Sequence, residues 1–389
     1  MTVSHKVRLL DRHGQPYSYV LQGERNWHLP AKPTFNRQVY AAAHVVADPQ
    51  RMQNPHSDMA IDWDATLAYR RHLMSLGLGI AEAMDTAQRG MGLNWGTGLE
   101  LIQRSVEQAK AYPGTLIASG AGTDHLTDFT GLTLQDVIAA YEQQIAAIEA
   151  CGGRIILMAS RALAAIATGP DDYIKVYGTL LRQVKEPVIL HWLGDMFDPA
   201  LRGYWGGNTL HAAMEVCLAV IRENEAKVEG IKISLLDKDR EIEMRRQLPA
   251  SVKMYTGDDF NYPELIAGDE QGYSHALLGI LDGIAPAATS ALHALAQGDR
   301  ATFDKILSPT VPLARHLFSA PTQYYKAGIV FLAWLNGHQQ HFTLLGGLQS
   351  ARSLTHYCEA FRLADQAGLL ENADIASERM WLLAKLHGI

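Results

Sequence analysis

Short apolar runs alternate with longer amphipathic segments along most of this chain. The runs have the length of β-strands that are buried on both faces, and the segments between them show the three-to-four-residue spacing of helices that pack on one side. The alternation begins after Pro33 and continues to Ile280. The predicted strands lie around residues 39–46, 79–84, 115–119, 154–159, 187–192, 228–235, 252–256 and 272–280.

Strand followed by helix, eight times over, predicts a (β/α)8 TIM barrel, an α/β fold with a closed parallel sheet. The same alternation also permits an open doubly wound sheet. The nucleotide-binding fingerprint that would favour the open sheet is poor. Residues 90–96 miss the G-x-G-x-x-G spacing by one position, and residues 120–125 lack the third glycine. The pattern therefore favours the closed barrel.

Two regions lie outside the eight repeats. Residues 7–10 and 17–21 are apolar runs around the turn-forming sequence Asp-Arg-His-Gly, which predicts a short N-terminal β-hairpin. From Pro286 onward the strand patterns stop and amphipathic helices run to the end. We therefore expect an N-terminal extension at 1–34, the barrel at 35–285 and a helical C-terminal region at 286–389.

Composition and charge argue against nucleic acid and membranes as binding partners. The chain has 389 residues, of which 48% are hydrophobic and 19% charged, and no apolar run is long enough to form a membrane helix. With a net charge of -7 and no cluster of Lys and Arg, neither nucleic acid nor a membrane surface is an expected partner. The three cysteines are widely spaced within apolar helical patterns, which favours a reducing, cytoplasmic location.

Lys232 interrupts one of the buried strands. In the segment 229–236, Ile231, Ile233 and Leu235 share one face, so Lys232 and Ser234 share the other. An inward lysine would be deprotonated by burial and become a nucleophile for a carbonyl carbon. The alternative is a lysine at the strand end whose ammonium reaches water.

Chemistry in such a barrel lies where the strands end at their carboxyl face. His191 ends the fifth strand and is the expected general acid or base, because an imidazole titrates near neutral pH. Arg161 is either a ligand for a carboxylate or phosphate or a surface residue that opens a loop. The other polar residues that we place at these ends or on the last strand are His44, Asp85, Thr86, Ser234, Asp258, Asp259 and His275.

Several segments together resemble a known enzyme family. They are Pro187-Val188-Ile189-Leu190-His191, Gly230-Ile231-Lys232, Thr256-Gly257-Asp258-Asp259 and, in the tail, Ala320-Pro321-Thr322. In order and spacing they resemble the N-acetylneuraminate lyase/dihydrodipicolinate synthase family of class I aldolases, over residues 35–370. The resemblance implies a (β/α)8 barrel with a helical tail, a lysine that forms an imine with an α-keto acid, and a homodimer or homotetramer.

This sequence departs from that family at two places. His191 stands where the family normally has a tyrosine, and residues 84–88 replace a Gly-Thr-Thr-Gly-Glu-type loop that binds the keto-acid carboxylate. Asp85 introduces a negative charge there, whereas Thr86 keeps a hydroxyl. We therefore expect either a sugar-derived carbonyl substrate without that carboxylate, or an Asp85 that is neutralised by Arg161 or a metal ion.

Three hypotheses follow. The first is a lyase or aldolase that uses a Lys232 imine, with His191 as general acid and base and Asp258 and Asp259 binding substrate hydroxyls, and with no cofactor. The second is a metal-dependent sugar epimerase, isomerase or lyase, and the third is a ligand-binding relative without catalysis. His338 and His341, three residues apart, are interpreted as part of a solvated turn. The metal ligands of the second hypothesis would come from His44, His191, Asp259 and His275.

Overall fold

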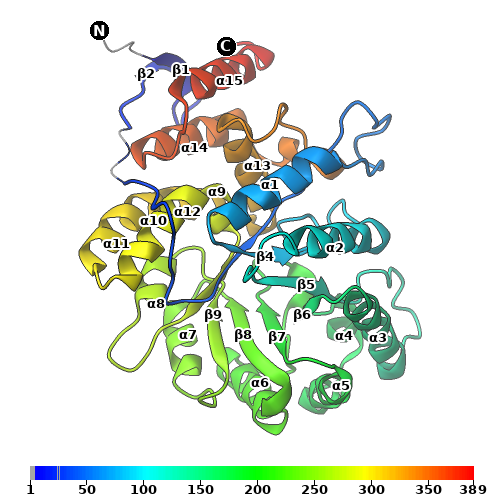
Figure 1. The fold of residues 1–389 in the computed structure, drawn as a ribbon. Helices are drawn as coiled ribbons and strands as arrows, with labels where there is room; N and C mark the ends of the chain where they lie inside the picture. The colour runs from blue at the N-terminus through cyan, green and yellow to red at the C-terminus, as the bar shows by residue number, and fades with distance from the viewer. Residues whose placement is uncertain (1–4, 24, 26) are drawn as a thin grey trace. The chain divides into compact units, whose positions relative to one another are not determined.

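The computed structural model describes residues 5–23, 25 and 27–389 (Figure 1). Their contacts divide the chain into two compact units. The barrel unit contains residues 37–43 and 78–278, and the helical unit contains 44–77, 279–389 and the described part of 1–36. This grouping differs from the three contiguous segments that the sequence predicted, because residues 44–77, between the first two barrel strands, group with the C-terminal helices.

Eight parallel strands close the barrel unit. Each strand pairs with its neighbours in chain order, and the last pairs with the first. The predicted closed barrel is confirmed, and the open doubly wound sheet is wrong. The strands are β3 (Val39–Ala42), β4 (Gly79–Glu82), β5 (Ile117–Ala121), β6 (Arg154–Leu157), β7 (Val188–Leu193), β8 (Val228–Ser234), β9 (Lys253–Thr256) and β10 (His275–Leu278).

The helices of the barrel unit follow the strands in the expected order and cover their outer face (Figure 1). Local sequence sets where they begin: the Thr133 side chain caps the third helix and exchanges hydrogen bonds with Asp136 in a capping box. The helices are α2 (Trp95–Ala109), α3 (Leu134–Ala150), α4 (Arg161–Ile166), α5 (Pro170–Gln183), α6 (Leu210–Glu223), α7 (Lys238–Arg245) and α8 (Tyr262–Ala267), with single 3-10 turns η1 (Pro199–Leu201) and η2 (Glu225–Lys227).

The interior of the barrel is a packed apolar core below the carboxyl ends of the strands. Alternate residues of the strands meet there, among them Tyr40, Ile156, Ile189, Tyr255 and Leu277. Because successive side chains point to opposite faces, the residues two positions further along a strand, toward its carboxyl end, point inward as well. The polar positions of the candidate site therefore lie directly above this core.

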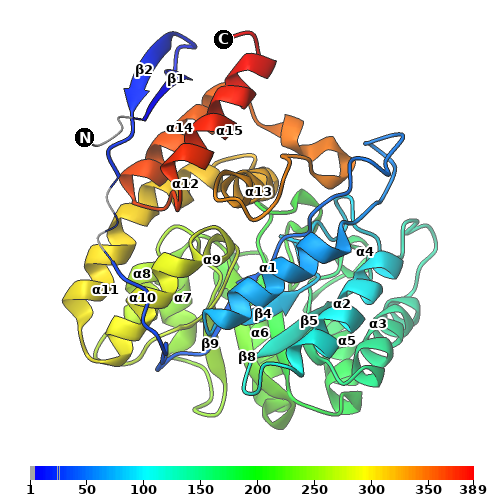
Figure 2. The ribbon, with the colours of Figure 1, turned by 45° about the horizontal axis from the view of Figure 1, so that its top comes forward.

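The helical unit carries the predicted N-terminal hairpin and the C-terminal helices. Strands β1 (Lys6–Leu10) and β2 (Pro16–Val20) pair in antiparallel fashion and pack against the last two helices (Figure 2). The Tyr19 hydroxyl donates to Asp365 Oδ2 at 2.6 Å, which anchors the hairpin. The helices are α1 (Trp63–Ser75), α9 (Ile280–Gly283), α10 (Ala285–Ala296), α11 (Arg300–Leu307), α12 (Val311–Leu317), α13 (Tyr325–Leu335), α14 (Leu354–Gln366) and α15 (Ala373–Leu386), with 3-10 segments η3 (Ser308–Thr310), η4 (Thr322–Tyr324) and η5 (Leu345–Ala351).

Two further sequence-based expectations concern membranes and thiols. Within the described residues, every helix is too short or too polar to cross a membrane. Cys151, Cys217 and Cys358 are all free thiols. The reducing location inferred from the cysteines stays a prediction.

Candidate functional site

Lys232 lies inside the barrel unit. Its neighbours in the sheet register are His191 on β7 and Tyr255 on β9. Since Tyr255 belongs to the interior core, Lys232 faces inward too, and its residue surface is only 7% exposed. Burial lowers the pKa of the Lys232 amine, an effect that the negative charges of Asp85 and Asp259 oppose. Lys232 is therefore the buried, inward lysine of the strand-based prediction, and burial favours its nucleophilic form.

Gly257, the residue after β9, leaves the space that the lysine side chain occupies. A Cβ atom on Gly257 would lie 2.8 Å from Lys232 Cε and 2.3 Å from Ser234 Oγ. Both distances are shorter than any real contact of a Cβ atom, so only glycine fits without a shift of the neighbouring strand. The glycine of the Thr-Gly-Asp-Asp sequence thus has a packing function beside the amine.

His191 lies in the carboxyl-terminal half of β7, which continues to Leu193, rather than at its end as the sequence predicted. Ser234 is the last residue of β8, and both side chains are buried. His191 Nε2 lies 3.2 Å from Ser234 Oγ, within hydrogen-bond distance. Burial, helped by the charge of Lys232, holds the pKa of His191 well below its ordinary value. The imidazole is therefore neutral at physiological pH and can accept a proton or a hydrogen bond.

The three acidic residues of the predicted site differ in their surroundings. Asp85 and Asp259 both act electrostatically on the Lys232 amine. Asp258 instead closes its own loop: Oδ1 accepts from the backbone N–H groups of Phe260 and Asn261 at 2.8 and 3.0 Å, and Oδ2 accepts from Asn261 Nδ2 at 2.8 Å. The structure thus places Asp85 and Asp259 beside the lysine, while Asp258 shapes the turn before α8.

Thr86 and Arg161 belong to the barrel unit but differ in exposure. Thr86 is buried in the loop after β4, next to Asp85. Arg161 begins α4, and its Nε contacts Asp198 Oδ2 at 2.5 Å in a partly exposed ion pair. Arg161 is thus ion-paired with Asp198 rather than with Asp85. Its role in binding a substrate carboxylate or phosphate stays a prediction.

The structure corrects the assignment of His275 to the substrate site and gives His44, which follows the carboxyl end of β3, its own partners. His275 is the first residue of β10, not its end, and its Nδ1 accepts from the Gln38 backbone N–H at 2.8 Å at the amino-terminal side of the strands. Burial lowers the pKa of His275 to about 4. His44 belongs to the helical unit, where its Nδ1 lies 2.9 Å from Asp282 Oδ2 and its Nε2 lies 3.2 Å from Gln339 Oε1.

Comparison with protein families gives one match that spans nearly the whole chain. The family described as "Protein of unknown function (DUF993)" matches residues 7–389. The chain belongs to this family. A comparison with curated proteins finds no match.

Solved structures add the fold relationship. Dihydrodipicolinate synthase from Aquifex aeolicus is 14% identical over 86% of this chain and 100% of its own, with a TM-score of 0.62. The corresponding enzyme from Thermotoga maritima is 15% identical over 87% and 100%, with a TM-score of 0.64. YagE from E. coli K12, a prophage protein of the dihydrodipicolinic acid synthase family in complex with pyruvate, is 12% identical over 86% and 100%, with a TM-score of 0.65. At these identities the likeness shows the shared fold.

Sequence reasoning missed a buried arginine that connects the loops after β4 and β5. Arg89 forms an ion pair with Asp124. Its Nη2 also donates a hydrogen bond to Gln144 Oε1 at 3.0 Å. Its Nη1 also donates to the carbonyl oxygens of Ala83 and Gly120, both at 3.2 Å. Arg89 thereby connects the loop that carries Asp85 to β5 and to the loop that follows it. Arg89 lies in a loop segment, next to Gly90, where no hydrophobic periodicity signals this role.

A second missed residue is Glu241 on α7. It is buried, and its carboxylate oxygens accept from the hydroxyls of Ser274 at 2.6 Å and Thr256 at 2.9 Å. Burial raises the pKa of Glu241 to about 8, although both hydroxyls oppose the shift. Because Thr256 precedes Gly257, this carboxyl group supports the end of β9 from outside the barrel. The only sequence signal is a glutamate at a core-facing position of a very polar helix.

Proposed function

We propose that this chain is a class I lyase or aldolase that binds a sugar-derived carbonyl substrate through an imine with Lys232. The observation that carries the proposal is the pairing of a buried lysine of lowered pKa with a neutral, buried His191 on the neighbouring strand. A lowered pKa increases the unprotonated fraction of the amine, and the adjacent imidazole provides a proton carrier. The shared fold with dihydrodipicolinate synthases supports the same reaction class.

The proposed chemistry uses these two groups in sequence. The Lys232 amine attacks the carbonyl carbon, the carbonyl oxygen gains a proton, and loss of water leaves a protonated imine. In the cleavage direction, His191 accepts the proton of the substrate hydroxyl two carbons from the imine carbon. The carbon–carbon bond then breaks, and its electron pair moves into the imine to give an enamine. Protonation of the enamine and addition of water release the second product and restore the amine.

The charges around Lys232 favour a substrate without a carboxylate. YagE from E. coli was solved with pyruvate, a keto acid. In this chain Asp85 and Asp259 both lie close enough to Lys232 to raise the pKa of its amine. A substrate carboxylate next to the imine carbon would meet these negative charges, whereas hydroxyl groups of a ketose can donate hydrogen bonds to them. We therefore place ketose-like compounds ahead of keto acids.

Borohydride trapping tests the proposal. The protein is incubated at pH 7 with dihydroxyacetone, a series of ketoses or pyruvate, reduced with sodium borohydride and mapped by peptide mass spectrometry. We expect a reduced adduct on Lys232 in the wild-type protein and none in Lys232→Met. Lys253→Met is the matched control, because Lys253 begins β9 in the same barrel and pairs with Glu229 at 3.2 Å.

The outcome separates the three hypotheses. An adduct on Lys232 that persists in Lys253→Met supports the imine. Absence of a Lys232 adduct across the panel, or adducts spread evenly over exposed lysines, contradicts it. If a sugar is turned over without any Lys232 adduct, and if a chelator abolishes that turnover, the metal-dependent epimerase, isomerase or lyase is favoured. Ligand binding without turnover would favour a binding protein. A cytoplasmic location and assembly as a homodimer or homotetramer accompany the proposal as predictions.

A further inference from the structure

Three side chains of the helical unit that are far apart in sequence converge at one point. They are His72 in the last turn of α1, His338 after α13 and Glu371 between α14 and α15. Each offers one ligand atom, and these three atoms all lie within 4.8 Å of one another. Within the described part of the chain this is the one group of three or more His, Cys, Asp or Glu residues with the spacing of a metal site. It excludes His44, His191, Asp259 and His275.

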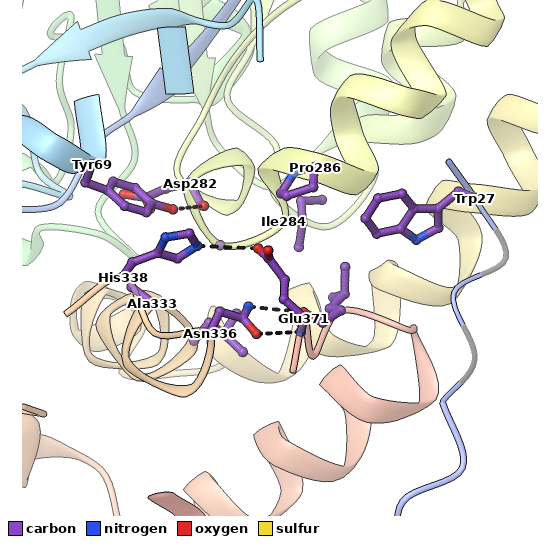
Figure 3. Close-up of a pocket in the computed structure, with 12 residues that line it drawn as sticks. Trp27, Tyr69, Asp282, Ile284, Pro286, Ala333, Asn336, His338 and Glu371 are labelled. Carbon is purple, nitrogen blue, oxygen red and sulfur yellow. Dashed lines mark hydrogen bonds and ion pairs between the residues drawn. The ribbon is translucent and has the colours of Figure 1, made fainter. Parts of the chain in front are cut away.

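The contacts within the group are direct. The His72 and His338 rings lie 4.5 Å apart between centroids, and His338 Nε2 lies 3.4 Å from Glu371 Oε1. Figure 3 shows the His338 ring directed at the Glu371 carboxylate, with a dashed line between them. His72 Nε2 is buried and has no hydrogen-bond partner among the described residues. A buried imidazole nitrogen without a partner is costly unless a ligand satisfies it.

Surrounding residues hold two of the three groups in place. Tyr69, one turn before His72, packs edge-on against the His338 ring at 5.0 Å, and its hydroxyl donates to the Asp282 carbonyl at 2.6 Å. Asn336 fixes the segment that carries Glu371, because its Oδ1 accepts from the Glu371 backbone N–H at 2.9 Å (Figure 3). Such outer contacts are what orient metal ligands in known sites.

We propose that His72, His338 and Glu371 bind a divalent transition metal, with Zn²⁺ as the expected ion. Two imidazole nitrogens and one carboxylate form a mixed nitrogen and oxygen set that suits Zn²⁺ and its first-row neighbours and does not suit Ca²⁺ or Mg²⁺. Ligand atoms around a tetrahedral Zn²⁺ lie about 3.3 Å apart, given bonds of about 2.0–2.1 Å. The ligand atoms lie within 4.8 Å of one another, so metal binding requires the Glu371 carboxylate and the two rings to move closer by side-chain rotation. Three protein ligands leave one position for water or a small ligand.

This site joins the end of α1 to two segments of the C-terminal region. The metal would thus stabilise the helical unit by binding its folded form alone. A small cavity beside the group is lined by His338 and Glu371 together with Trp27, Tyr69, Asp282, Asn336 and Leu369 (Figure 3).

Metal titration of the full-length protein tests this proposal. Chelator-treated, dialysed protein is titrated with ZnCl₂ by calorimetry and with CoCl₂ by visible absorption, which reports the geometry around the ion. We expect one Zn²⁺ per chain, a tetrahedral or five-coordinate Co²⁺ spectrum, and affinities in the order Zn²⁺, Co²⁺, Mn²⁺ from tight to weak. His72→Gln, His338→Gln and Glu371→Gln should each weaken Zn²⁺ binding at least about tenfold.

His341→Gln is the matched control, because His341 lies three residues after His338 and outside the group. It should bind Zn²⁺ like the wild-type protein, and at one Zn²⁺ concentration the melting temperature of both should rise more than that of any of the three ligand variants. Glu371→Gln keeps the side-chain shape and tests the proposal even where a histidine variant fails to fold. No saturable binding by the wild-type protein, or binding that survives all three substitutions, overturns the proposal. Equal binding of Mg²⁺ or Ca²⁺ does so too.

Discussion

His191 Nε2 and Ser234 Oγ lie 3.2 Å apart and join the carboxyl-terminal halves of β7 and β8. The two residues flank Lys232 in the sheet, one on the neighbouring strand and one two positions further along its own strand. The hydrogen bond therefore sets the orientation of the ring next to the amine. A catalytic imidazole commonly depends on such a partner for its orientation and tautomer.

Replacing Ser234 by alanine should separate imine formation from proton transfer. Without the hydroxyl the His191 ring loses its partner, so we expect turnover of a trapped ketose to fall about tenfold, while the borohydride adduct on Lys232 persists. The free energy of unfolding should fall by about 1 kcal/mol, the usual net contribution of one hydrogen bond. Ser251→Ala, at an exposed position of the same unit, is the control. Equal turnover in both variants would contradict a role for Ser234.

Gly257→Ala tests the close packing beside the lysine. The added methyl group would overlap Ser234 Oγ and Lys232 Cε, so the lysine must move. We expect a loss of about 1–3 kcal/mol in unfolding free energy, the typical cost of overpacking, and at least a tenfold smaller borohydride adduct. Gly169→Ala is the matched control, because a Cβ atom there meets nothing within 4 Å. The two variants are compared by chemical denaturation and adduct yield, and similar results for both would argue against the packing role.

The sequence predicted those features that depend on local periodicity. The closed barrel follows from the eightfold repeat of strand and helix patterns, and the inward direction of Lys232 follows from alternation within one strand. Neither needs knowledge of contacts between distant residues. His275 lies on the last strand, as predicted, but its inclusion in the substrate site at the barrel mouth was wrong, because an apolar run does not mark where its strand begins. It is the first residue of β10 and therefore lies at the amino-terminal end of the barrel.

Pairings between distant residues gave no sequence signal. Asp258 and Asp259 are adjacent and chemically identical, and only the loop geometry assigns the first to Asn261 and the second to the surroundings of Lys232. Arg89 meets Asp124 through a fold that brings two loops together. The neighbours of His338 were likewise not its sequence neighbour His341 but residues from α1 and the segment before α15. Such contacts follow from tertiary packing rather than from spacing.

The buried Glu241 should make stability depend on pH. Its carboxyl group keeps its proton up to about pH 8 in the folded chain but ionises near pH 4.5 in the unfolded chain. Between these values the folded state binds more protons, so the unfolding free energy contributed by this group falls as pH rises. Glu241→Gln removes this dependence. The free energy of unfolding of the variant, relative to that of the wild-type protein, should therefore rise by up to about 1.4 kcal/mol for each pH unit between pH 5 and pH 8.

Urea denaturation at several pH values measures this difference. Glu243→Gln, on the same helix but partly exposed, is the control and should run parallel to wild type. A Glu241→Gln curve that also runs parallel to wild type would mean that Glu241 is ionised in the folded protein at neutral pH.

Arg89→Met should be strongly destabilising. The substitution keeps much of the side-chain volume but removes the ion-pair partner of Asp124 and the Arg89 donor to the carbonyl groups of Ala83 and Gly120. Breaking a buried pair in this way costs about 3–5 kcal/mol. Arg104→Met removes an exposed ion pair with Glu100 and should cost less than about 0.5 kcal/mol. Thermal and urea unfolding of both variants provide the comparison, and a loss below about 1 kcal/mol for Arg89→Met would contradict the structural role.

Asp85 should control which carbonyl compounds react with Lys232. Its charge opposes a substrate carboxylate and raises the pKa of the amine, so Asp85→Asn removes a repulsion and favours the unprotonated lysine. The second effect increases reaction with every carbonyl compound, whereas the first acts on keto acids alone. The ratio of pyruvate to dihydroxyacetone adducts therefore isolates the charge effect. We expect this ratio to rise at least about tenfold, or ~1.4 kcal/mol, because a buried site screens the repulsion between two negative charges less than water does. Asp195→Asn, in the exposed ion pair with Arg202, should leave it unchanged. An unchanged ratio in Asp85→Asn would show that the exclusion of keto acids has another cause.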